Sequence, residues 1–155
     1  MKRWLWCAGA LLLAAVLGGM PFVGTDIAKL HPAEVLRVQK TGDIIFVELD
    51  TGDSGKGKTL ETAIQDLKES TPGKVFLETV EYLLINGEAE ALLERLSEYL
   101  RPACGVCLED GTVKLGEVAE FLGTHTPELI LQEYRAGDHS LQKLVVREER
   151  MYFVS

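Results

Sequence analysis

Two short stretches of this sequence carry residue types that can do chemistry: a segment rich in glycine and lysine, and a pair of cysteines. The first, Gly52–Thr59, has the letters GDSGKGKT and matches the phosphate-loop pattern G-x-x-x-x-G-K-[ST] at every position. In such a loop, glycines let backbone N–H groups surround phosphate oxygens, and the lysine reaches the terminal phosphates. The residues expected to bind a nucleotide in this way are Gly52, Gly57, Lys58 and Thr59.

The surroundings of this segment also fit a purely structural interpretation. The apolar run 44–47 predicts a strand before it, and a helix is expected after it because Leu60, Ala63, Ile64 and Leu67 share one helical face. A glycine-rich turn between strand and helix, with Thr59 as the N-cap, would have the same sequence. No apolar run ending in an aspartate offers a convincing Mg²⁺ ligand, so we favour the structural turn over nucleotide binding.

The second stretch, Cys104-Gly-Val-Cys107, has the spacing of a thiol–disulfide motif. Active dithiols of the thioredoxin kind lie at a helix N-terminus that lowers a thiol pKa, whereas this pair follows Pro102 and an expected helix. In an extended segment, side chains three positions apart point to opposite faces of a sheet. Zinc would need two further ligands, and His125 and His139 have no familiar spacing. Structural cysteines are the favoured interpretation, with a redox pair as the alternative and no metal site expected.

The N-terminus has the pattern of an export signal or a membrane anchor. Lys2 and Arg3 precede 21 residues, Trp4 to Gly24, without a charged side chain. That length is enough for a helix to cross a bilayer, and the basic pair would hold the N-terminus inside. We therefore expect residues 1–24 to form a signal peptide or membrane anchor and residues 25–155 to form an extracytoplasmic domain. Cys7 lies inside the apolar run, so it does not mark a lipid-anchor site.

Composition narrows the possible partners. The chain has 155 residues and a net charge of −8, and without Lys2 and Arg3 the remaining 14 basic and 24 acidic side chains give −10. An acidic domain of this kind repels nucleic acid and anionic lipid head groups. No Ser/His/Asp arrangement or pair of catalytic carboxylates stands out, and no cofactor is expected. The predicted partners are the membrane, through the N-terminal helix, and other membrane proteins.

Hydrophobic periodicity predicts one small α/β (α+β) domain with a mixed sheet and about three helices, preceded by the N-terminal apolar helix. The run 82–85, apolar on both faces, is the expected central strand. The expected strands span residues 34–39, 44–50, 82–85, 104–108, 129–134, 144–147 and 151–154, and the expected helices span 59–69, 88–100 and 113–122.

From Gly57 onward the order of short motifs resembles the N-terminal domain of the Ger(x)C family, the C subunits of spore germinant receptors. The motifs are the Gly-Thr turn and helix start in Gly57–Ala63, the aliphatic strand and Gly-Glu turn in Tyr82–Glu88, the Leu-Arg pair and proline in Tyr99–Pro102, and the strand, turn and helix in Val106–Leu122. The resemblance covers about residues 33–125. Members of that family are lipoproteins with further domains, whereas this sequence lacks the lipobox cysteine and stops at Ser155.

The resemblance implies a non-catalytic accessory protein, tethered to the membrane and facing outward, with a role in sporulation or germination. We therefore expect a single-pass membrane protein, or a secreted one if the N-terminal segment is cleaved, that works by contact with other proteins. Nucleotide binding through Gly52–Thr59 and thiol–disulfide exchange through Cys104 and Cys107 are the alternatives.

Overall fold

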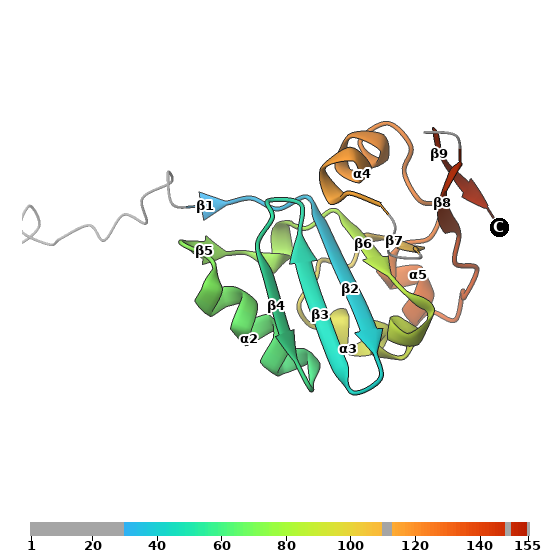
Figure 1. Cartoon of the computed structure of the whole chain (residues 1–155). Coiled ribbons are helices and arrows are strands. Elements are labelled where there is room, and N and C mark those ends of the chain that lie inside the picture. The colour runs from blue at the N-terminus through green and yellow to red at the C-terminus, as the bar shows by residue number, and fades with distance from the viewer. Residues whose placement is uncertain (1–29, 110–112, 148–149, 155) are drawn as a thin grey trace, which may run out of the picture.

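The computed structural model describes residues 30–109, 113–147 and 150–154, which build a seven-stranded mixed sheet with helices on both faces (Figure 1). The strand order is β4-β3-β2-β6-β7-β8-β9. Neighbouring strands from β2 to β8 run parallel, and an antiparallel neighbour flanks them on each side. The fold is therefore of the mixed α/β kind. The strands are β2 (Val35–Thr41), β3 (Ile44–Leu49), β4 (Ser54–Gly57), β6 (Tyr82–Ile85), β7 (Gly105–Leu108), β8 (Lys143–Arg147) and β9 (Arg150–Val154).

The first strands form the predicted hairpin. β2 pairs antiparallel with β3 from Leu36↔Leu49 to Thr41↔Ile44, and Gly42 adopts a positive φ of 59° in the turn between them. Because side chains alternate across a sheet, Leu36 and Val38 face one side while Arg37 and Gln39 face the other. This alternation defines the two faces of the sheet against which the helices pack.

β6 is the central strand that its apolar sequence predicts. It lies between β2 and β7, parallel to both, and Leu83, Leu84 and Ile85 have no exposed surface. Successive residues of β6 belong to different core clusters, with Leu83 on one face and Leu84 on the other. Both faces at this strand are therefore covered.

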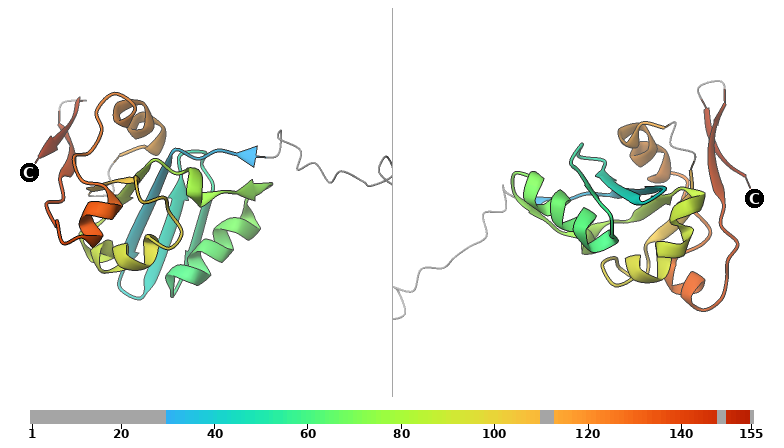
Figure 2. Two further views of the ribbon diagram at one scale, coloured as in Figure 1. Left: turned by 180° about the vertical axis from the view of Figure 1, so that it is seen from behind. Right: turned by 60° about the horizontal axis from the view of Figure 1, so that its bottom comes forward.

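One face of the sheet, which we call the α2 face, carries most of the helices (Figure 2). It packs against α2 (Leu60–Ser70), the 3-10 helix η3 (Gly87–Leu92), α3 (Leu93–Leu96) and α5 (Leu131–Arg135). The opposite face, the α4 face, packs against α4 (Leu115–Leu122), whose Leu115, Val118 and Leu122 meet Leu84 and Leu144.

Local sequence explains where the helices begin. The Thr59 side chain accepts a hydrogen bond from the Thr62 N–H, and the Thr62 hydroxyl accepts one from the Thr59 N–H, so α2 starts as predicted. Asn86 caps η3 in the same way, accepting from the Ala89 N–H. The predicted helix over 88–100 is shorter than expected, because it begins as a 3-10 helix and its α-helical part ends at Leu96.

Two predictions are wrong, one for the segment after the cysteines and one for the glycine-rich segment. Residues 129–134 were expected to form a strand, but only a single bridge joins Ile130 to Gly105, and α5 follows it at once. The Glu133 carboxylate accepts from the Ile130 N–H at 3.1 Å, so a side chain three residues ahead starts a helix where the apolar run Leu129–Leu131 indicates a strand. The second error is β4, which lies inside the segment expected to be a loop.

The remaining elements are short. β1 (Leu30–His31) pairs parallel with β5 (Lys74–Val75), and the 3-10 helix η2 (Leu77–Thr79) leads from β5 toward β6. At the other end of the chain, β8 and β9 pair antiparallel as predicted.

The predicted N-terminal helix, residues 1–24, lies outside the described residues. Among the residues that are described, no helix has the length and apolar character needed to span a bilayer.

Candidate functional site

The glycine-rich segment Gly52–Thr59 does not form a loop between a strand and a helix. Gly52 turns the chain with a φ of 91°, and Ser54–Gly57 then run back along β3 as the antiparallel edge strand β4. A phosphate loop instead follows a strand directly into a helix whose N-terminus meets the phosphate. The sequence did not predict β4 because two of its four residues are glycine, which is depleted in strands.

Gly55 and Gly57 have a packing role in β4. A Cβ at either position would lie less than 3.0 Å from backbone atoms of α2, at Ala63 and Leu67 for Gly55 and at Thr62 and Ala63 for Gly57. Only residues without a side chain allow the helix backbone to rest directly on the strand. The two glycines of the motif thus account for the close contact between α2 and β4.

Two backbone N–H groups of the segment already have side-chain partners within the protein. The Lys56 N–H donates to Asp66 Oδ2 at 2.8 Å, and the Thr59 N–H donates to Thr62 Oγ1 at 3.1 Å. A phosphate would have to displace a carboxylate and a helix cap. The arrangement therefore favours the structural interpretation of Gly52, Gly57, Lys58 and Thr59.

The two cysteines belong to different cores. Cys104 packs on the α2 face and Cys107 on the α4 face, and both are free and fully buried. Burial is the main cause that raises the pKa of each thiol to about 12. A thiol that keeps its proton is a poor nucleophile and a poor metal ligand. This environment favours the structural interpretation of the pair.

The histidines weighed as zinc ligands lie apart from each other. His125 stacks on Phe121 at the end of α4, with 4.4 Å between ring centroids, and His139 makes an edge contact with Tyr134 after α5. Over the described residues, no group of three or more His, Cys, Asp or Glu side chains has a geometry that could hold a metal ion.

The most unusual polar feature is a buried ion pair that sequence reasoning missed. Arg37 of β2 reaches across β6 to Glu109, which directly follows β7, with Nε 2.8 Å from Oε1. Their side chains are 9% and 0% exposed. The available sequence signal was a charged residue in or directly after an apolar run: Arg37 lies between Leu36 and Val38, and Glu109 follows Leu108.

Further hydrogen bonds complete this cluster. Arg37 Nη1 donates to Glu48 Oε2 at 3.2 Å, and Arg37 Nη2 also donates to the Val113 carbonyl. Gln39 Nε2 donates to Glu109 Oε1 at 3.1 Å. A buried charge is tolerated only when it is paired and hydrogen-bonded, and here both partners are. The cluster ties the hairpin to the segment between β7 and α4.

Beside the ion pair, the α4 face is open. Gln39, Phe46 and Lys56 form a row across β2, β3 and β4, and Phe46 and Ile44 are 42% and 44% exposed. A groove of about 410 Å³ follows this row, lined also by Glu48, Ser54 and Asp66. Apolar side chains within a polar rim on an exposed sheet are typical of a protein contact surface rather than of a catalytic site.

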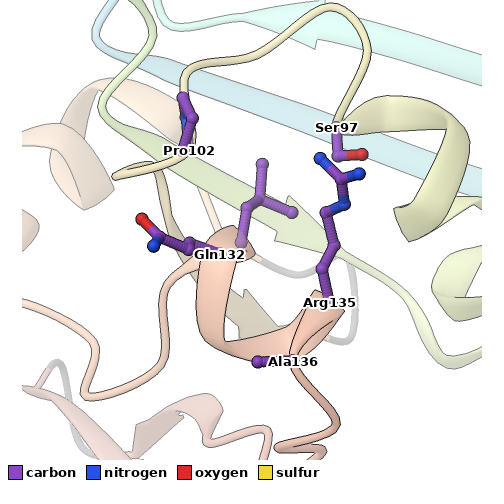
Figure 3. A pocket seen from close by; sticks show the side chains of 6 residues that line it. Ser97, Pro102, Gln132, Arg135 and Ala136 are labelled. Carbon is purple, nitrogen blue, oxygen red and sulfur yellow. The ribbon is translucent and has the colours of Figure 1, made fainter.

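A second cavity, of about 520 Å³, lies on the other side of the sheet between the end of α3 and α5. Leu131 and Pro102 give it an apolar lining, and Arg135 extends from α5 toward Ser97 (Figure 3). Gln132 is the remaining polar side chain of the wall. The residues that line this cavity do not include a nucleophile paired with a general base. We therefore regard it as a surface hollow between two short helices.

Comparisons of the chain with protein-family models, with curated proteins and with solved structures find no match.

Proposed function

We propose that this protein is a non-enzymatic, membrane-tethered accessory protein whose domain lies outside the cytoplasm and acts by contact with other membrane proteins. The tether is supported by Lys2 and Arg3 followed by the uncharged run Trp4 to Gly24. The resemblance to the Ger(x)C family supports a role in sporulation or germination. No cofactor is part of the proposal.

The observation that carries the contact role is the open part of the α4 face. Phe46 and Ile44 are large apolar side chains with more than two fifths of their surface exposed, in the first half of a strand whose other face is buried. The buried ion pair Arg37–Glu109 holds this strand pair in place from one side. A sheet surface on which exposed apolar side chains lie beside polar ones has the composition of an interface.

Charge indicates the partner. Residues 25–155 carry 14 basic and 24 acidic side chains. Electrostatic complementarity then favours the extracytoplasmic part of a membrane protein that surrounds an apolar centre with basic side chains. Such a pair should associate more slowly and more weakly as salt is raised, because exposed charges are screened.

A topology reporter fused after Ser155 tests the tether. The expected result is activity of a reporter that works only outside the cytoplasm, and a cytoplasmic readout would contradict the proposal. The contact is tested in cells with a photo-crosslinking amino acid at position 46, and at the exposed Gln65 of α2 as the matched control. We expect one membrane-protein adduct from position 46 that is reduced in high salt, and no such adduct from position 65. Equal crosslinking from both positions would contradict the contact surface.

A further inference from the structure

We infer that β9 is the surface through which two copies of this chain associate, by antiparallel pairing of β9 with β9 about a twofold axis at Tyr152. The inference does not depend on the membrane tether or on the open α4 face. It follows from the difference between the two edges of the sheet and from the sequence of the second edge.

The β4 edge is closed by its own helix. Asp66 of α2 accepts from the Lys56 N–H at 2.8 Å, and the Ser70 hydroxyl donates to the Ser54 carbonyl at 2.9 Å. Backbone groups that a new strand would need are thereby occupied. Covering an edge with a helix is one of the ways in which proteins prevent unwanted strand pairing.

The β9 edge has a different character. The strand pairs with β8 on its inner side, from Lys143↔Val154 to Arg147↔Arg150, and the sheet ends with it among the described residues. In an antiparallel ladder, alternate residues turn their N–H and C=O groups away from the existing partner. Met151 to Val154 are apolar or aromatic residues, three of them with high strand propensity, and the run has no proline, glycine or charge that would discourage pairing.

The same residues are self-complementary, which points to a second copy as the occupant. Pairing about Tyr152 sets Met151 opposite Phe153 of the other copy, on both sides of the axis. Both side chains lie on the α4 face, where Phe153 already contacts Phe121 with ring centroids 5.7 Å apart. Thioether–aromatic contacts of this kind are favourable. On the opposite face, Val154, which is 41% exposed, would be covered by the aliphatic part of Arg150.

Charge also favours this approach. Each chain carries −8, so two copies repel each other overall, but the hairpin segment 143–154 contains three basic and two acidic residues. Antiparallel pairing sets the two copies of Arg150 four residues apart along the strands, roughly 14 Å at about 3.4 Å per residue. That separation exceeds the Debye length of about 8 Å at physiological ionic strength. At the hairpin a second copy therefore meets less repulsion than the net charge of the chain implies.

The first test measures the mass of the full chain in detergent by sedimentation equilibrium over a range of concentrations. We expect a monomer–dimer equilibrium, and Tyr152→Lys, which sets two lysines together at the axis, should raise the dissociation constant at least about tenfold. Val145→Lys is the matched control, because Val145 pairs with Tyr152 on the inner strand and is also half-buried. A monomer at every concentration, or equal effects of both variants, would overturn the inference.

A second test does not depend on whether the lysine variants fold. In a Cys7→Ala background, Tyr152→Cys should form a covalent dimer on mild oxidation, because residues directly opposite in an antiparallel pair have Cα atoms about 4.5–5.5 Å apart, within disulfide range. Val145→Cys should stay monomeric under the same conditions. Cys104 and Cys107 are buried and will not contribute. Failure of Tyr152→Cys to crosslink above the level of Val145→Cys would exclude the proposed register and with it the inference.

Discussion

The two faces of the β2–β3 hairpin differ sharply although they are made by the same two strands. On the α2 face, Val38 and Leu49 are fully buried, whereas on the α4 face Ile44 and Phe46 are 44% and 42% exposed. Strand propensity is similar on both faces, so what separates them is coverage: α2 and its neighbours reach across the hairpin, and α4 packs further along the sheet. At this hairpin, therefore, the α2 face is buried in the core, and the α4 face leaves large apolar side chains exposed to solvent.

The largest effect is expected at the ion pair that bounds the open face. Glu109→Ala leaves Arg37 buried and without its main partner, and it should lower the free energy of unfolding by about 3–5 kcal/mol. Urea denaturation followed by circular dichroism measures this. Glu48→Ala is the control, because Glu48 is 43% exposed and its loss should cost less than about 1 kcal/mol. The double variant Arg37→Met/Glu109→Leu should recover most of the lost free energy of unfolding. If Glu109→Ala left the free energy of unfolding unchanged, the cluster would not anchor this face.

The next prediction compares the two faces of β3 directly. Leu49→Ala opens a cavity on the α2 face and should cost about 2–5 kcal/mol, whereas Phe46→Ala on the α4 face should change stability by about 0.5 kcal/mol or less. Thermal and urea unfolding of both variants gives the comparison. A large loss for Phe46→Ala would mean that the open face is covered within the protein itself.

A smaller effect is expected where β4 meets α2. Gly55→Ala introduces a Cβ against the helix backbone and should cost about 1–3 kcal/mol through overpacking. Gly116→Ala is the control within α4, because a Cβ there meets nothing within 4 Å and helix propensity should stabilise the protein by up to about 1 kcal/mol. The two substitutions should therefore shift the midpoint of urea unfolding in opposite directions. Equal shifts would contradict the packing role of the glycine.

The smallest effect concerns the two thiols, one on each face. Burial raises the pKa of Cys104 and of Cys107 to about 12, so the folded state keeps protons that the unfolded state loses above about pH 9. Their stabilising contribution is complete below pH 9 and declines as pH rises toward 12, by about 1 kcal/mol for each thiol near pH 10. A Cys104→Ala/Cys107→Ala variant should lose less stability between pH 8 and pH 10 than the wild type.

Alkylation of the native protein sharpens the same comparison. Both thiols are fully buried, Cys104 on the α2 face and Cys107 beneath α4, so both should resist iodoacetamide at pH 8 and react only after unfolding. Faster labelling of Cys107 than of Cys104 would show that the α4 face opens there as well.

Hydrophobic periodicity predicted the secondary structure well for elements that bury a face against the rest of the domain. Tyr82–Ile85 forms the central strand with the predicted bounds, and Thr59 caps α2 as expected. The pattern failed where tertiary contacts outweigh local preference. Gly55 and Gly57 lie in a strand despite their low strand propensity, because the backbone of α2 packs directly on them. Leu129–Leu131 leads into a helix because the Glu133 side chain caps its start. A charged residue in or after an apolar run can be read locally, but a single sequence does not show that Arg37 and Glu109, 72 residues apart, pair with each other.

That same separation has a consequence for how the domain folds. Arg37 joins Glu109 and Val113 over 72 and 76 residues, so the contact closes a very long loop and is costly in chain entropy until β6 and β7 have assembled between them. We expect the ion pair to form after the rate-limiting step of folding. Its loss should then leave the refolding rate almost unchanged and accelerate unfolding. The cluster would in that way contribute to the kinetic stability of the domain, because it sets how long the native sheet persists once formed.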